Sequence, residues 1–219
     1  MNLVLDTGRR TRTMAWMTVA SRRWGDDNSL YDDAEARRRL VESAGRCIIG
    51  RGNTEIRMAD VADEAGVVRS TVYRYYATRD DLLLELLLTR VDDAVARWVR
   101  SLRRPHDAAS SIRELVIKPV GSVEGDPLNK ALFAAESSAL RSVLEVGAQP
   151  MLEVMERHVV PLLKGWQADG QVYADLNCRD TLYWMHNASL FLLSPLWRDR
   201  PTAAKRRFVD RYIVRALVR

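Results

Sequence analysis

One short stretch, residues 58–76, constrains what this chain can fold into more than any other. Val61, Ala62 and Ala65 recur at helical spacing, so they line one face of a short helix. Gly66 follows at once, and glycine readily adopts the left-handed backbone that a tight helix exit needs. The sequence therefore predicts a short helix that ends in a sharp turn at Gly66.

A second short helix is predicted from about Arg69 to Tyr76, with Val72 on its inward face. A small residue four positions before the turn glycine, and an apolar residue six positions after it, are typical of a helix-turn-helix. Arginines on the outward face suit a phosphate backbone, and hydroxyl groups there can reach bases or phosphates. The predicted outward residues are Arg69, Ser70, Thr71, Tyr73, Arg74 and Tyr75. An ordinary corner between two helices is the alternative, and outward tyrosines argue against it.

The same stretch resembles the signature of TetR-family transcriptional regulators. The resemblance lies in Val61-Ala62, Ala65-Gly66-Val67, the run from Thr71 to Tyr76, and the run from Arg79 to Leu83. It is specific over about residues 32–90 and architectural beyond them. It implies that the second helix enters the DNA major groove, with base contacts from Arg69, Ser70 and Thr71 and phosphate contacts from Tyr73, Tyr75 and Arg79. Arg74 belongs to the same expected DNA-binding surface.

Two positions depart from the family pattern. Val68 stands where the family usually has a capping serine, so the second helix lacks a side-chain cap worth roughly 1 kcal/mol. Arg57 replaces a common Ser or Thr at the start of the first helix, where its charge can still hold a phosphate. The missing cap at Val68 favours an alternative in which the head no longer binds DNA.

The rest of the chain predicts an all-α protein of 219 residues, since alternating apolar runs are absent and 47% of the residues are hydrophobic. We expect a flexible basic leader over residues 1–30, a three-helix DNA-binding head over 31–78 and a helical ligand-binding and dimerisation domain over 79–219. For the leader, a basic arm that lies along DNA is an alternative.

In the third domain a long helix from about residue 80 to 102 links the head to the body. Further helices are expected near residues 108–120, 128–136, 150–168, 179–194 and 202–218. Another segment is expected to begin at Ser137-Ser138 and to break at Gly147. A loop is expected at residues 121–127.

The chemistry of an enzyme is missing from the sequence. None of its three histidines stands at metal-ligand spacing from another ligand, and no Gly-rich phosphate loop, GxSxG or CxxC motif occurs. We therefore expect no catalytic residues, metal or cofactor. Cys47 and Cys178 are expected to be free thiols in a reducing cytoplasm. No apolar run approaches the ~20 residues that span a bilayer, so a membrane partner is not expected.

Two further surfaces are predicted in the body. The family resemblance implies a ligand cavity between the long helix and the carboxy-terminal helices, for a drug-sized apolar molecule. Its candidate residues are Trp98, Phe133, Met151, Met155, His158, Tyr183, Trp184, His186 and Asn187. The last two helices resemble the four-helix dimer interface of the family. The candidate interface residues are Leu182, Met185, Ser189, Leu192, Phe208, Ile213 and Ala216, with an internal core as the alternative.

These parts together predict a homodimeric regulator, most often a repressor, that a small apolar ligand releases from double-stranded operator DNA. The alternative is a helical small-molecule carrier or interaction module that no longer binds DNA.

Overall fold

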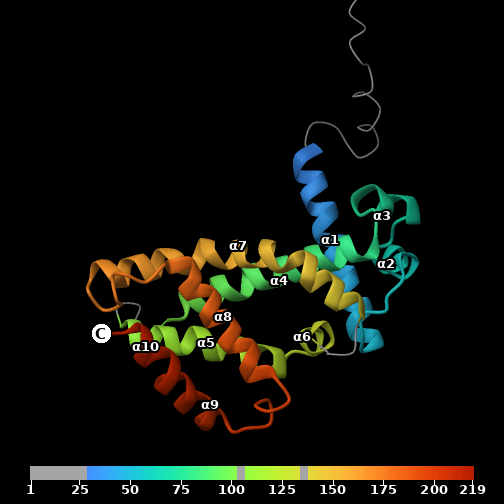
Figure 1. Ribbon diagram of the computed structural model, residues 1–219. Helices are drawn as coiled ribbons and strands as arrows, with labels where there is room; N and C mark the ends of the chain where they lie inside the picture. The colour runs from blue at the N-terminus through green and yellow to red at the C-terminus, as the bar shows by residue number, and fades with distance from the viewer. Residues whose placement is uncertain (1–28, 103–106, 134–137) are drawn as a thin grey trace, which may run out of the picture. The chain divides into compact units, whose positions relative to one another are not determined.

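The computed structural model describes residues 29–102, 107–133 and 138–219, and its regular structure there is helical (Figure 1). The helices are α1 (Ser29–Arg51), α2 (Met58–Ala65), α3 (Arg69–Tyr75), α4 (Arg79–Arg100), α5 (Ala108–Gly125), α6 (Pro127–Leu132), α7 (Ser138–Ala168), α8 (Cys178–Leu193), α9 (Thr202–Val209) and α10 (Arg215–Leu217), with a π-helical turn, η1 (Asp210–Val214), between the last two. One isolated bridge joins Val172 and Val218. The predicted all-α class is confirmed. The predicted leader lies almost wholly outside the described residues.

A first core holds the head together. Its buried side chains come from α1, α2, α3 and the start of α4, and include Leu40, Ile48, Val61, Val72 and Leu83. Cys47 packs against this core, as predicted, and desolvation raises the pKa of its thiol. Apolar side chains of α6 complete the same core, so the boundary predicted at residue 78 falls within continuous packing.

Helix α6 reaches this core through a close contact. A Cβ atom at Gly45 of α1 would lie 3.2 Å from Cδ2 of Leu128, so glycine leaves room for the Leu128 side chain at this contact. A polar network fixes the start of α6. Arg90 of α4 donates hydrogen bonds to Asp126 at 2.6 Å and to Asn129 at 2.9 Å. Asp126 in turn caps α6 through the backbone N–H of Asn129.

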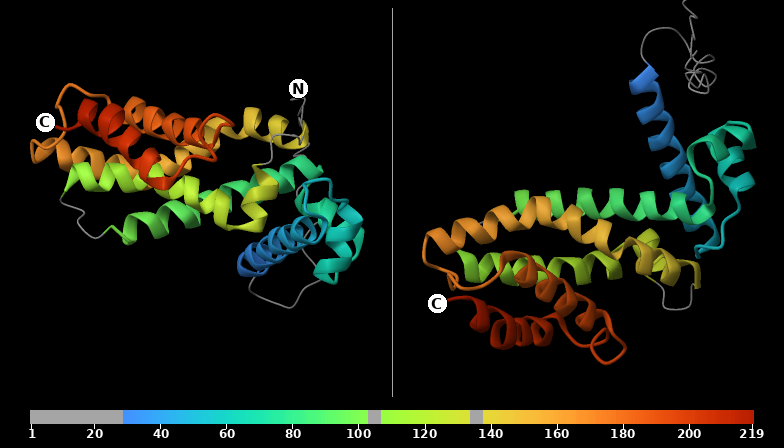
Figure 2. Two further views of the ribbon diagram at one scale, coloured as in Figure 1. Left: turned by 90° about the horizontal axis from the view of Figure 1, so that it is seen from below. Right: turned by 45° about the horizontal axis from the view of Figure 1, so that its top comes forward.

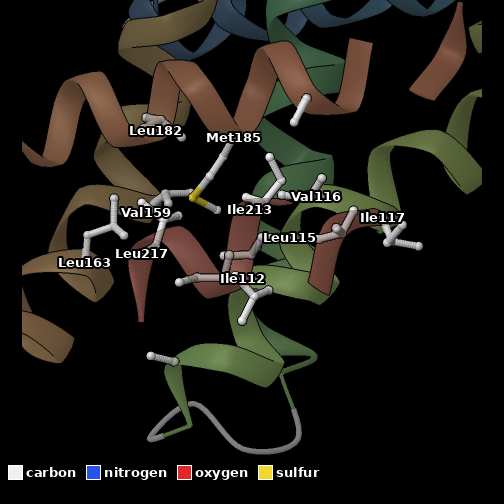
Figure 3. Packing of buried hydrophobic residues seen from close by; sticks show 14 of the residues in the cluster. Ile112, Leu115, Val116, Ile117, Val159, Leu163, Leu182, Met185, Ile213 and Leu217 are labelled. Carbon is white, nitrogen blue, oxygen red and sulfur yellow. The ribbon is translucent and has the colours of Figure 1, made fainter. Parts of the chain in front are cut away.

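A second core holds the body together. Helix α4 packs along α7, α5 packs against α8, and α9 with η1 covers α5 (Figures 1 and 2). Side chains of α5, α7, α8 and the carboxy-terminal helices converge around Met185 and Ile213 (Figure 3). None of the described helices combines the length and the apolarity needed to cross a bilayer.

Two predicted breaks in the helices are wrong. Helix α5 continues past Val120 to Gly125, through the segment expected to be a loop. Helix α7 runs unbroken through Gly147 and Pro150. A glycine inside a helix costs about 1 kcal/mol, and a proline about 3 kcal/mol or more. We attribute the continuity of α7 to its buried stripe against α4 and α8, formed by Met151, Val154, Met155, Val159 and Leu163.

Candidate nucleic-acid interface

The corner between α2 and α3 has the predicted geometry. Gly66 takes the left-handed backbone, with φ at +68°. The N–H groups of Gly66 and Val67 donate back to the carbonyls of Asp63 and Ala62, at 3.1 and 3.0 Å. These bonds satisfy carbonyls that the end of α2 would otherwise leave open. Ala62 and Val72 are buried at this corner, so the corner holds α3 in one orientation.

The outward face of α3 presents cations and phenols together. Arg69, Ser70, Tyr73 and Arg74 are exposed, and Thr71 is half-buried. Arg69 donates to the Tyr73 hydroxyl at 2.9 Å and lies over its ring, 5.1 Å from the centroid. The pair is one helical turn apart, so each side chain limits the conformations of the other.

Tyr75 is only partly on the outward face of α3, where the sequence predicted it. It is half-buried and packs against the head core, because it lies next to the inward stripe that contains Val72 and Tyr76. Arg74 donates to its hydroxyl at 3.2 Å, which keeps that end of the side chain near the surface. Tyr75 therefore offers its hydroxyl group, while Tyr73 offers a whole exposed side chain.

Arginines of the head differ in whether a carboxylate holds them. Arg46 pairs with Glu64 at 2.6 Å and Arg51 pairs with Asp60 at 2.7 Å. By contrast, Arg57, Arg69 and Arg74 have no carboxylate partner among the described residues. Their positive charge is therefore left uncompensated within this part of the chain.

Arg79 behaves differently from the other predicted DNA contacts. It is the first residue of α4, after the N-cap Thr78, whose hydroxyl accepts from the N–H of Asp81. Its guanidinium donates to Glu55 at 3.0 Å and lies 3.4 Å from Asp80. Sequence reasoning missed Glu55, because a loop residue has no periodicity that would place it beside the start of α4.

Three of the residues predicted for the ligand pocket line one small cavity between α4, α5, α7 and α8: Trp98, Met155 and His186. The cavity measures about 40 Å³. That is space for one or two water molecules, far below the 300–1,000 Å³ of a typical ligand pocket. Burial lowers the pKa of His186, so its imidazole is neutral at neutral pH.

The other predicted pocket residues lie elsewhere. Met151 is buried in the body core without lining the cavity, and Phe133 packs against the head core instead. Trp184 and Asn187 are exposed, because they lie on the face of α8 opposite the core.

Two polar members of the predicted pocket are held by neighbouring side chains. The Nε2 atom of His158 lies 2.7 Å from Asp92 of α4. The Tyr183 hydroxyl donates to Glu156 at 2.7 Å, and this bond, with one from Arg179, lowers the pKa of Glu156. Neither side chain lines the small cavity.

An open surface groove of about 630 Å³ lies along α7 and the start of α8. Its lining is charged, with Glu156, Arg157, Lys164 and Arg179, and includes none of the predicted pocket residues. In the described part of the chain, no cluster of His, Cys, Asp or Glu could hold a metal ion.

Most residues predicted for a dimer interface belong to the core of their own chain. Leu182, Met185, Ser189, Leu192 and Ile213 are buried. The reason is that the apolar stripe of α8 packs on α5 and α7 of the same chain. Phe208 is half-buried and Ala216 is exposed, and these two remain at the surface.

An exposed aromatic cluster lies beside them. Phe191 and Phe208 each stack near Trp197, at 5.7 and 4.6 Å between ring centroids, and Phe208 lies 4.9 Å from Tyr212. Phe191 is 41% exposed and Tyr212 54%. The four-residue spacing of Phe208 and Tyr212 was visible in the sequence, whereas the place of Trp197 in a loop was not.

Residues 40–86 match the family model described as bacterial regulatory proteins, tetR family. The head of the chain is a TetR-family domain. The match covers the head core and both helices of the corner, which are the elements that carry the resemblance. TetR-family proteins are DNA-binding transcriptional regulators rather than enzymes, so the predicted regulatory class is confirmed.

The curated proteins that are similar in sequence to the chain are also HTH-type transcriptional regulators. The HTH-type transcriptional regulator BetI of Agrobacterium fabrum is 36% identical over 80 residues, which cover 35% of this chain and 38% of BetI. The chain spans between 37% and 53% of the length of the curated relatives that it matches.

Solved structures share the fold of the chain. The TetR-family transcriptional repressor QsdR of R. erythropolis superposes with a TM-score of 0.63 at 19% identity, covering 84% of this chain and 95% of QsdR. The regulator FadR from Bacillus subtilis, solved with stearoyl-CoA, gives a TM-score of 0.54 at 15% identity, covering 82% of this chain and 98% of FadR. At such identities the likeness establishes the architecture alone.

The uncapped start of α3 gives a testable prediction. Val68 is 68% exposed and provides no side-chain cap. The change Val68→Ser should supply an acceptor for the first N–H groups of α3 and stabilise the head by about 0.5–2 kcal/mol. Hydrogen exchange of the α3 amides measures the effect. Val68→Ala removes the same exposed side chain without adding an acceptor, so equal protection in the two variants would contradict the prediction.

Proposed function

We propose that the chain is a repressor that binds operator DNA as a homodimer and is released by a small apolar ligand held in its body. DNA contacts come from the outward face of α3 and from both flanks of the corner. The proposed contact residues are Arg57, Arg69, Ser70, Thr71, Tyr73, Arg74, Tyr75 and Arg79. Repression is the direction of control in QsdR, whose architecture the chain shares.

One observation carries the proposal for DNA: three arginines of the head lie on α3 or just before α2 and have no carboxylate partner in the described part of the chain. Arg69 and Arg74 lie on α3 and Arg57 precedes α2, whereas the arginines of α1 at positions 46 and 51 are neutralised by carboxylates. A row of phosphates is the partner that such a distribution attracts, because each neutralised phosphate releases a counterion. Paired surface arginines would contribute far less.

The side chains on α3 suit two different tasks. Arg69, Ser70 and Thr71 lie at its amino-terminal end, the part of a recognition helix that reads base edges. Arginine can bind the O6 and N7 atoms of guanine with two hydrogen bonds. Tyr73 and the hydroxyl of Tyr75 suit phosphate oxygens, which fix the position of the helix without reading sequence.

The homodimer follows from the geometry of duplex DNA and from the exposed aromatic cluster. Two recognition helices enter successive major grooves when they lie about 34–36 Å apart, which a two-fold dimer achieves on a near-palindromic site. The aromatic cluster around Phe191 and Tyr212, with Leu196 75% exposed beside it, is the apolar surface that a second copy would cover. This surface replaces the buried stripe of α8 as the proposed interface.

The small cavity around His186 is where we propose that a ligand enters. A drug-sized molecule does not fit into about 40 Å³, so binding requires α4, α5, α7 or α8 to move. Helix α4 lines the cavity through Val95 and Trp98, and its first turns belong to the head core. A ligand that favours the opened cavity therefore shifts the head away from its DNA-binding arrangement. A coupling of about 1–3 kcal/mol would weaken operator binding about 5- to 150-fold.

The DNA assignment is tested by removing one base contact and one phosphate contact together. The double variant Arg69→Ala/Tyr73→Ala should bind at least about 10-fold more weakly, since a bidentate base contact alone contributes about 1–3 kcal/mol. Fluorescence anisotropy with a duplex selected by the wild-type chain from a random pool gives the affinity. The matched variant Arg97→Ala/Tyr173→Ala removes the same residue types from exposed sites on the body and should bind as wild type does. Equal affinity of both double variants would refute the assignment.

The dimer is tested at the aromatic cluster. Phe191→Glu places a charge in the proposed interface, where its desolvation opposes association. Light scattering after size-exclusion chromatography should give about twice the 25.0 kDa chain mass for wild type and the single chain mass for Phe191→Glu. Ile49→Glu alters an apolar residue that is 51% exposed on α1 and should stay dimeric. A wild-type chain that runs as a monomer would disprove the dimer.

A further inference from the structure

Among the arginines proposed to contact DNA, Arg79 is the one that carboxylates already hold in the described part of the chain. Its Nη1 atom donates to Oε2 of Glu55 at 3.0 Å, and its Nε atom lies 3.4 Å from Asp80. Asp80 is its neighbour in sequence, whereas Glu55 lies in the connection between α1 and α2. The bond to Glu55 therefore joins two segments that are distant in the chain.

This pair is weak enough for a phosphate to displace. The side chains of Arg79 and Glu55 are 31% and 58% exposed, so water screens their attraction. Exposed ion pairs contribute about 0–1 kcal/mol. A phosphate offers charged oxygens that can bind a guanidinium with two hydrogen bonds. Glu55 and the phosphate therefore compete for the same guanidinium.

We infer that Glu55 is a positioning residue that limits how strongly Arg79 binds a DNA phosphate. It orients the guanidinium in the free protein and competes with the phosphate for it on binding, so it sets both the affinity and the salt dependence of this contact. The inference rests on the proposed function, in which Arg79 reaches the DNA backbone. Its chemistry concerns phosphate, so every operator sequence should respond in the same way.

A purely structural pair would behave in the opposite way. If Glu55 served only to brace the corner against α4, its loss would loosen the head, and DNA binding would weaken. The two roles therefore predict opposite signs for a single substitution. Glu55→Gln tests them well, because the amide keeps the size of the side chain and an acceptor for Arg79 while removing the charge.

The experiment measures binding of the full chain to the duplex selected by wild type, over a range of salt concentrations. Glu55→Gln should bind about two- to five-fold tighter, the range that an exposed ion pair allows. The slope of log affinity against log salt should become steeper by up to about 0.9, as for one more neutralised phosphate. In an Arg79→Ala background the same substitution should change neither quantity.

Glu64→Gln is the matched control. It removes the same charge from the head and frees Arg46, which is outside the proposed contact set. A gain equal to that of Glu55→Gln would mean that net charge alone is responsible and would overturn the inference. So would a gain that persists without Arg79, or weaker binding by Glu55→Gln. A wild-type chain that binds no duplex would instead overturn the proposed function, and this inference with it.

Discussion

The close crossing of α2 and α3 is the constraint on which the head depends. Ala62 is small enough for the second helix to pass over it, and Gly66 takes a backbone conformation, φ of +68°, that other residues adopt only with strain. Val72 then fills the angle between the helices with a fully buried side chain. Because these three positions fix the orientation of a helix only seven residues long, the polar face of α3 is presented without a cap and without a helix long enough to be stable by itself.

Two cores share the elements that join them. Helix α4 gives its first turns to the head core and its later turns to the body core, and α6 adds Leu128 to the head although it follows α5 of the body. Arg90 ties α4 to the start of α6 through Asp126, so these elements are linked by charge as well as by packing. A displacement of α4 or α5 at the small cavity would therefore be transmitted to the head core through α4 and α6. Helix α4 is thus the element on which the proposed coupling between ligand and DNA depends.

The sequence predicted what depends on local order along the chain. The corner at Gly66, the three helices of the head and the long α4 follow from periodicity and turn chemistry, which neighbouring residues determine. The sequence-based predictions failed where packing between distant segments determines the structure. Helix α7, for example, runs through Pro150 because other helices cover its apolar stripe. The pairing of Glu55 with Arg79 is likewise a property of the folded chain.

The central claim is that the polar face of α3 lies in a DNA groove twice in each assembly. An iron chelate that generates hydroxyl radicals, attached at Ser70→Cys in a chain whose own cysteines are replaced, reports where that face lies on the selected duplex. The account predicts two zones of strand cleavage, centred about 10 base pairs apart. The same chelate at the exposed position Ala203→Cys on α9 should produce neither zone. Cleavage that is absent, or scattered equally for both positions, would contradict the claim.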